Sequence, residues 1–259
     1  MPLGVFDSGI GGLTVVRALR SAFPLRDILY VGDTARVPYG NKSPETVQTY
    51  SREIVDFLEQ KGAEQIVAAC NTASALAVES LAKTRQTPLH GMIESGVAAA
   101  LAAGEGPVGV IGTPATIASG AYQKALAKAR PGLRVVAQAT PLFVPLVEEG
   151  WLEGEVTEKV ARQYLELLIR EKIRVLVLAC THYPLLKGVL GKVLGPEVKL
   201  VDSSEACAES LKATEVSRAE KGELKIFLTD EPGPFLGRVE SFLGKGAVVS
   251  VERIHLPHG

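Results

Sequence analysis

The sequence predicts an α/β protein made of two pseudo-symmetric, mainly parallel-sheet domains, with a site in the cleft between them. Short apolar runs alternate with helical stretches along the chain, as is typical of parallel sheets. Two of these runs end at a cysteine followed by small polar residues, Cys70 and Cys180, and two others lead into polar turns at Ser8 and Thr113. A strand with a polar turn and a strand with a cysteine therefore occur twice, as expected for two related halves. Chance similarity between short apolar strings is the alternative, and a cysteine at both places argues against it.

Eight apolar runs are expected to be strands, because strands buried in a parallel sheet are apolar on both faces. The runs are Leu3–Phe6, Ile28–Val31, Ile66–Ala69, Val108–Ile111, Leu133–Ala137, Val175–Ala179, Val198–Val201 and Leu224–Leu228.

Two helices have clear sequence signals. Ser43 and Pro44 form an N-cap followed by proline at the first helical position, and Gly62 is placed to end that helix near Lys61. The segment 155–171 is predicted to be a scaffold helix with one apolar stripe. The residues of that stripe are Val156, Val160, Tyr164, Leu167 and Leu168.

The domain boundaries are expected at two crossovers. Gly and Ala crowd the segment 91–106, and a second crossover is expected near 201–207. The final fifty or so residues are then expected to return to the first domain. The predicted domains are 1–95 together with 207–259, and 96–206.

Composition and charge limit the classes of function. The net charge is −1 and no block of Lys or Arg occurs, which argues against nucleic acid and favours a small-molecule partner. No apolar stretch is long enough to span a membrane, and the N-terminal sequence lacks the features of a signal peptide, so a cytoplasmic location is expected. Three cysteines do not resemble a disulfide framework, and the Cys180-x-His182 pair has no second pair that would complete a metal site.

The two cysteines are the strongest candidates for chemistry. Groups just past the carboxyl ends of parallel strands line the ligand crevice of open α/β sheets. Cys70 and Cys180 are each expected at a helix start, where amide dipoles lower a thiol pKa. Either cysteine alone is more often a buried structural residue. Two equivalent thiols fit a reaction that needs an acid and a base on opposite faces of one carbon, whereas a single cysteine nucleophile would leave the second thiol unexplained.

The loop 7–12 is glycine-rich and follows the first strand. Its backbone amides are placed to hold an anion at a helix N-terminus, although a tight turn alone also accounts for the glycines. It is not a dinucleotide loop, because Thr14 stands where the third glycine of that fingerprint is required.

Taken together, several motifs closely resemble glutamate racemases, members of the aspartate/glutamate racemase superfamily. They occur in the family order and cover most of the chain. The motifs are Asp7-Ser8-Gly9-Ile10-Gly11-Gly12, Gly32-Asp33-Thr34-Ala35-Arg36-Val37-Pro38-Tyr39-Gly40, Cys70-Asn71-Thr72-Ala73, Thr113-x-x-Thr116-x-x-Ser119-x-x-Tyr122 and Cys180-Thr181-His182-Tyr183-Pro184.

The resemblance implies an isomerase that interconverts L- and D-glutamate without a cofactor or a metal. One cysteine, as thiolate, would remove the α-proton, and the other, as thiol, would deliver a proton to the opposite face. By analogy, Cys70 would act on the D-isomer and Cys180 on the L-isomer. The resemblance further implies D-glutamate supply for peptidoglycan synthesis and a homodimer.

The resemblance also assigns helper and substrate-binding residues. Asp7 would assist Cys70, while Glu148 and His182 would assist Cys180, with Glu149 left as an alternative to Glu148. The residues matching substrate-binding positions are Asp7, Ser8, Tyr39, Gly40, Asn71, Thr72, Thr113, Thr116, Thr181 and His182. Arg36 and Lys42 are expected to be surface charges, and Cys207 a packing residue.

Three rival functions stay open at this point. An aspartate racemase typically has Glu where this chain has His182, which favours glutamate. A non-catalytic amino-acid-binding protein can also have two α/β halves, but it has no need of paired thiols. A cysteine hydrolase would use Cys180 with His182 and would make Cys70 dispensable.

Overall fold

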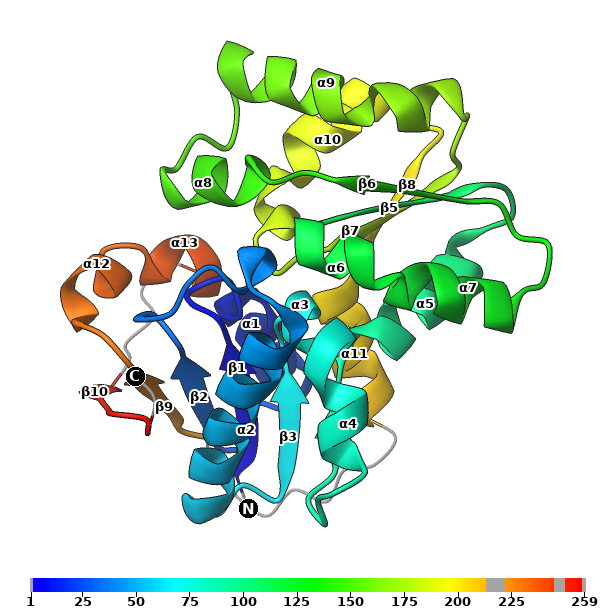
Figure 1. The fold of residues 1–259 in the computed structure, drawn as a ribbon. Helices are drawn as coiled ribbons and strands as arrows, with labels where there is room; N and C mark the ends of the chain where they lie inside the picture. Colours follow the sequence, from blue (N-terminus) through cyan, green and yellow to red (C-terminus); the bar gives the residue numbers. More distant parts are fainter. Residues whose placement is uncertain (1, 213–221, 245–249, 258–259) are drawn as a thin grey trace.

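The computed structural model describes residues 2–212, 222–244 and 250–257. It contains two parallel sheets, one in each half of the molecule (Figure 1). The first half is the part built on the six-stranded sheet, and the second half is the part built on the four-stranded sheet. The predicted fold class is confirmed.

The six-stranded sheet of the first half has the order β10-β9-β2-β1-β3-β4. Its strands are β1 (Leu3–Asp7), β2 (Ile28–Gly32), β3 (Gln65–Ala68), β4 (Leu89–His90), β9 (Leu224–Leu228) and β10 (Ser250–Arg253). The sheet of the second half has the order β6-β5-β7-β8. Its strands are β5 (Val108–Gly112), β6 (Val135–Ala139), β7 (Val175–Ala179) and β8 (Lys199–Asp202).

The two sheets share a common arrangement of four strands. In each, the strand that comes first along the chain lies between the second and the third, and the fourth lies beyond the third. Strand β1 therefore corresponds to β5, and β3 corresponds to β7. The first half differs by the added strands β9 and β10, which extend its sheet beyond β2.

Helices cover both faces of each sheet (Figure 1). In the second half, α9 and α10 lie on one face and α5, α6 and α7 on the other (Figure 1). The α-helices are α1 (Leu13–Ala22), α2 (Pro44–Gln60), α3 (Asn71–Ala73), α4 (Glu79–Ala82), α5 (Met92–Ala103), α6 (Pro114–Ser119), α7 (Ala121–Ala129), α8 (Phe143–Glu148), α9 (Glu155–Arg170), α10 (Lys187–Leu194), α11 (Ser203–Lys212), α12 (Pro232–Leu236) and α13 (Val239–Leu243). Three short helical turns cover Tyr39–Asn41, Ser74–Val78 and Tyr183–Leu186.

The helix signals in the sequence were correct at α2 and partly wrong at α9. Ser43 caps α2 by accepting a hydrogen bond from the Thr46 amide at 3.3 Å, and Gly62 follows with a φ of +86°. Helix α9 forms where expected, but Val156 is 53% exposed. The buried positions of α9 are Thr157, Ala161, Leu165 and Leu168. Of the predicted stripe, Leu168 is buried, and Val160 and Tyr164 are partly buried against the core.

Two strands were missed, and both are weak in sequence. Strand β4 has two residues, and β10 is largely exposed at the outer edge of its sheet. The predicted boundaries at 95/96 and 206/207 fall inside α5 and α11, two helices that pack on each other between the halves. The boundaries themselves stay predictions, and part of the span 207–259 lies outside the described residues.

In the described ranges, no helix is long and apolar enough to cross a membrane.

Candidate active site

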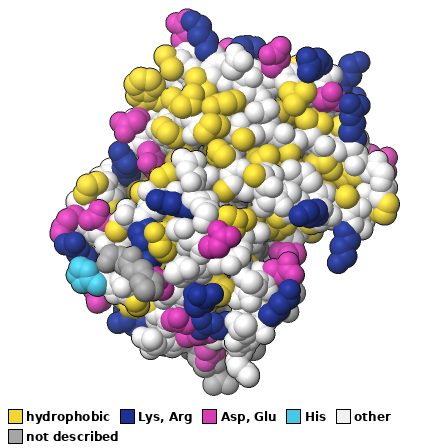
Figure 2. All heavy atoms as spheres, viewed as in Figure 1, with side chains coloured by type: hydrophobic (Ala, Val, Ile, Leu, Met, Phe, Trp, Pro, Cys, Tyr) yellow, Lys and Arg dark blue, Asp and Glu magenta, His cyan; other side chains and the backbone are white. Residues whose placement is uncertain are grey.

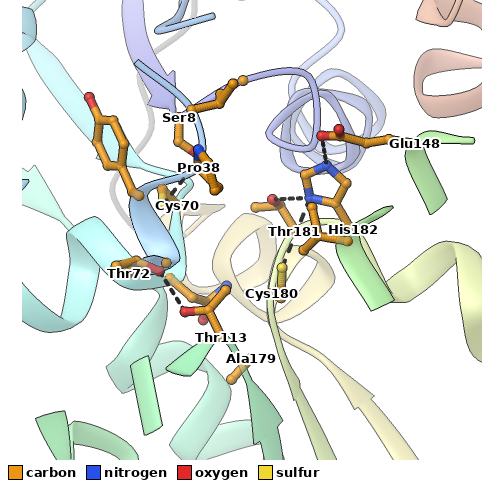
Figure 3. Close-up of a pocket in the computed structure, with 16 residues that line it drawn as sticks. Ser8, Pro38, Cys70, Thr72, Thr113, Glu148, Ala179, Cys180, Thr181 and His182 are labelled. Carbon is orange, nitrogen blue, oxygen red and sulfur yellow. Dashed lines mark hydrogen bonds and ion pairs between the residues drawn. The ribbon is translucent and has the colours of Figure 1, made fainter. Parts of the chain in front are cut away.

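A cavity lies between the two halves, at the carboxyl ends of their strands. Figure 3 shows Cys70 and Cys180 on opposite sides of it. We name the lining from the first half the Cys70 wall: Ser8, Gly9, Val37, Pro38, Tyr39, Gly40, Cys70, Asn71 and Thr72. The lining from the second half is the Cys180 wall: Thr113, Val144, Glu148, Ala179, Cys180, Thr181 and His182.

Cys70 follows β3 and precedes the short helix α3. It is 6% exposed, and its thiol lies 4.0 Å from the Ser8 hydroxyl. Burial, assisted by the nearby negative charge of Asp7, raises the pKa of the Cys70 thiol to about 12. The expectation of a lowered thiol pKa is therefore wrong for Cys70. The amides at the helix start do act in the expected direction, but desolvation outweighs them.

Asp7 ends β1 and lies behind the cavity lining, fully buried. Its carboxylate accepts a hydrogen bond from the Gly9 amide at 3.0 Å and one from the Thr181 hydroxyl at 3.4 Å. Burial raises the pKa of Asp7, although these hydrogen bonds and the charge of His182 oppose the shift. Asp7 thus touches a residue of the opposite half and also influences Cys70.

Cys180 is the first member of a chain of three polar groups (Figure 3). Its sulfur lies 3.9 Å from His182 Nδ1, and His182 Nε2 lies 3.0 Å from Glu148 Oε1. Glu149 points elsewhere: it is 70% exposed at its side chain, near Arg238. The structure therefore brings Glu148, and not Glu149, to His182.

His182 and Glu148 form an ion pair beside Cys180. Burial disfavours the imidazolium, but hydrogen bonds and charge from Cys180 and Glu148 outweigh burial and raise the pKa of His182 to about 10. Burial would also raise the pKa of Glu148, but the hydrogen bond and the charge of His182 lower it. A cation consequently lies next to Cys180, whereas Cys70 has a carboxyl group for its neighbour.

Three threonine hydroxyls join the two walls. Thr72 Oγ1 lies 2.9 Å from Thr113 Oγ1 and 3.0 Å from Thr116 Oγ1, and the latter two are 2.9 Å apart. Thr72 and Thr113 line the cavity, while Thr116 is 1% exposed and lies behind them. Thr116 is thus placed to orient the other two hydroxyls.

The loop before α2 supplies Tyr39 and Gly40. Tyr39 lines the cavity with its ring, but its hydroxyl donates a hydrogen bond to buried Asp33. Gly40 approaches the opposite wall so closely that a Cβ there would lie 2.6 Å from Thr113 Cβ. Both residues therefore form the cavity through shape and backbone, with the Tyr39 hydroxyl already engaged.

Arg36 is a buried charge, which corrects the expectation of a surface residue. Its guanidinium binds both oxygens of Asp33 at 2.8 and 3.0 Å and Glu53 at 2.6 Å. It is 7% exposed and also packs over the ring of Tyr50. No periodic pattern predicts this network, although Asp33 and Arg36 stand within the motif that runs from Gly32 to Gly40.

The loop 8–12 of the first half packs directly against the Cys180 wall. A Cβ at Gly11 would lie 2.4 Å from both His182 Nδ1 and Thr181 Oγ1. No larger residue fits at this position while His182 and Thr181 keep their places.

The arrangement supports proton transfer at one carbon from two sides. No lysine or arginine lines the cavity within the described residues, and these residues contain no group of three or more His, Cys, Asp or Glu that could hold a metal ion. The lining residues that the sequence interpretation did not assign are Gly9, Val37, Pro38, Val144 and Ala179. Gly9, Val37 and Pro38 lie within quoted motifs, whereas Val144 carries no local signal.

The comparisons with known proteins agree with this site. The family model described as Asp/Glu/Hydantoin racemase matches residues 13–211. A glutamate racemase of Geobacter metallireducens is 50% identical over 249 residues, covering 93% of this chain and 92% of the relative. The structure of a glutamate racemase isoform from Bacillus anthracis has a TM-score of 0.95 at 35% identity, covering 99% of this chain and 98% of that one. The structure of a Francisella tularensis glutamate racemase in complex with D-glutamate has a TM-score of 0.93 at 38% identity, covering 100% and 98%.

Proposed function

The chain belongs to the Asp/Glu/Hydantoin racemase family, and from this premise we propose that it interconverts L-glutamate and D-glutamate without a cofactor. The observation that carries the proposal is the pair of cysteines on opposite walls of one cavity. Relatives that align over more than nine-tenths of the chain are named glutamate racemase. The enzyme is thus an isomerase, a racemase of an amino acid.

The proposed mechanism uses one thiolate and one thiol. In the L-to-D direction, the Cys180 thiolate takes the α-proton, so the Cα–H bond breaks and an S–H bond forms. The electron pair left on Cα then takes the proton of the Cys70 thiol from the opposite face. Cys70 ends as thiolate and Cys180 as thiol, and the reverse reaction exchanges these roles. The raised pKa of Cys70 supports its starting state as thiol.

Three side chains assist the proton transfers. His182 and Glu148 place a hydrogen-bonded cation beside Cys180 and return protons to solvent. Asp7 exchanges protons with Cys70, because the raised pKa of Asp7 brings the carboxyl group closer in proton affinity to the thiol.

Neutral donors, together with the imidazolium of His182, bind the two carboxylates of the substrate. The proposed binding groups are the side chains of Ser8, Asn71, Thr72, Thr113, Thr181 and His182, and backbone near Gly40. Tyr39 contributes its ring, while Thr116 and Asp7 act from behind the lining. Hydroxyls and amides hold a carboxylate by charge-assisted hydrogen bonds without bringing a second cation near Cα.

A stereochemical assay tests the proposal. Purified protein is incubated with L-glutamate, D-glutamate or L-aspartate in D₂O, with no metal, pyridoxal phosphate or nucleotide added. We expect loss of optical rotation with both glutamate isomers, together with deuterium at Cα of the product. No change with any substrate would refute racemisation and would favour the amino-acid-binding protein. A preference for aspartate would keep the mechanism and overturn the substrate.

The cellular role is proposed on the same premise. The product D-glutamate would serve peptidoglycan synthesis in the cytoplasm.

The protein would work as a homodimer. Leu142 and Trp151 of the second half are 51% and 53% exposed, and Figure 2 shows hydrophobic side chains gathered on one face. Light scattering coupled to size exclusion tests the dimer, and a monomer mass would contradict it.

A further inference from the structure

Tyr122 belongs to the motif that starts at Thr113, yet nothing in the mechanism above uses it. It lies in α7 of the second half and is 1% exposed. Its hydroxyl lies 2.6 Å from Oδ1 of Asn71, which begins α3 in the first half. A buried phenol of one half therefore contacts a cavity residue of the other.

The short distance identifies which atom of the Asn71 amide faces Tyr122. A separation of 2.6 Å is ordinary for O–H···O and short for N–H···O. The carbonyl oxygen of Met92 is a second acceptor near the phenol, at 3.3 Å, and the side chain of Ser203 also hydrogen-bonds to Tyr122. A phenol has one proton, and the closer acceptor receives it. Asn71 Oδ1 is thus held by Tyr122, which leaves Nδ2 on the other branch of the amide.

Asn71 Nδ2 is buried and has no hydrogen-bond partner among the described residues. Asn71 itself lines the cavity and is 2% exposed. A buried donor without an acceptor is unfavourable, so its presence at a cavity points to a ligand acceptor. A carboxylate of the proposed substrate would supply that acceptor.

We infer that Tyr122 is a positioning residue, whose hydroxyl fixes the Asn71 amide so that Nδ2 faces the substrate carboxylate. The inference rests on the proposed glutamate racemisation. Without the phenol hydroxyl, the amide can rotate by half a turn and present Oδ1 to the carboxylate, which repels it. Tyr122 acts through Asn71 and does not touch the substrate.

The Tyr122→Phe variant tests this inference, because it removes the hydroxyl and keeps the ring. We expect KM for L-glutamate to rise about tenfold with a smaller change in kcat, since a hydrogen bond to a charged group is lost or misdirected. The matched control is Tyr164→Phe, which removes a phenol that pairs with the Leu142 amide away from the cavity; its KM should stay within twofold. Thermal unfolding of each variant separates binding effects from loss of fold.

A double-mutant cycle distinguishes positioning from general packing. Binding of L-glutamate is measured by calorimetry in a Cys180→Ser background, with Asn71→Ala and Tyr122→Phe singly and together. Asn71→Ala alone should weaken binding at least tenfold, and adding Tyr122→Phe to it should have less than a twofold further effect. An equal effect of Tyr122→Phe in both backgrounds, or unchanged affinity in Asn71→Ala, would overturn the inference. An inactive wild type refutes the proposed function, whereas an active wild type with an unaltered Tyr122→Phe variant refutes only the role of Tyr122.

Discussion

The Cys70 wall and the Cys180 wall are built from corresponding strands and carry different charges. Strands β3 and β7 occupy equivalent places in their sheets, and each delivers a cysteine to the cavity. Beside Cys180 stands the His182–Glu148 pair, while Cys70 has Ser8 in front and Asp7 behind. The comparison teaches that the repeated topology fixes where the thiols lie, while the neighbouring side chains give the two thiols different electrostatic surroundings.

The two walls are also supported differently. Under the Cys70 wall, the loop with Tyr39 is held by buried charges, Asp33, Arg36 and Glu53. On the other side, α8 is held by aromatic packing, with Phe143 edge-to-face against Tyr164 and Tyr183. One support depends on ion pairing and the other on apolar contact, so mutations should affect them to different extents.

Removing each thiol in turn is the strongest test of whether racemisation requires both cysteines. We expect Cys70→Ala and Cys180→Ala each to lower the rate of racemisation by about 10³-fold or more, because each removes a proton donor or acceptor. Cys207→Ala is the control, since Cys207 is buried in the core away from the cavity. The rate is followed by polarimetry with both isomers. Racemisation retained in either variant would contradict the two-base mechanism.

Removing the cation from the buried ion network under the Cys70 wall should destabilise the protein more than removing an exposed ion pair. Arg36→Met removes the cation that pairs with the buried carboxylates of Asp33 and Glu53, and we expect a loss of about 3–5 kcal/mol in the free energy of unfolding. Arg162→Met is the control, because its pair with Glu158 is exposed, and should change stability by less than about 1 kcal/mol. Urea unfolding measures both. Equal losses would contradict a structural role for the buried network.

Replacing Glu148 with glutamine tests whether Glu148 is the carboxylate that supports His182 in the Cys180 wall. Glu148→Gln removes the negative charge that stabilises the His182 imidazolium, so kcat/KM should fall about tenfold. The high-pH limb of the rate profile should also move to lower pH, because the pKa of His182 then falls. Glu149→Gln should leave both unchanged. If Glu149→Gln had the larger effect, the side-chain placement in this wall would be wrong.

The pH dependence of stability should report the same ion pair. The pKa of His182 is raised from 6.5 to about 10, so the folded protein binds this proton more tightly than the unfolded chain does. The resulting stabilisation is complete below pH 6.5 and is lost as pH rises toward about 10. Denaturant unfolding of wild type and His182→Gln should therefore show a difference that shrinks from pH 6.5 to pH 10. A constant difference would contradict a raised pKa.

Sequence alone predicted the repeated architecture because buried parallel strands leave long apolar runs. It missed β10, which is exposed and polar, and β4, which has only two residues. The family motifs brought in Glu148 and His182, but no pattern could choose between Glu148 and Glu149. That choice depends on which carboxylate the last turn of α8 directs at His182.

Contacts between distant residues account for the remaining errors. Arg36 was expected at the surface, because a charged residue is usually exposed and its partner Glu53 lies in another element. The thiol pKa of Cys70 was expected to fall, because helix starts are visible in sequence while the extent of burial is not. Tyr122 and Asn71 are 51 residues apart in sequence and contact each other across the two halves, so no local pattern reveals the pair.

Thermodynamics limits how far the unequal surroundings of the two thiols can favour one direction of the reaction. L- and D-glutamate are mirror images and have the same free energy in water, so the equilibrium constant of their interconversion is one. At equilibrium, the ratio of kcat/KM in the two directions must equal that constant, whatever the protein does. The His182–Glu148 pair can therefore make one direction saturate earlier and turn over more slowly, but kcat and KM must then change in the same proportion. Any variant of either wall keeps this equality, so an apparent one-way racemase among them would indicate an error in the assay.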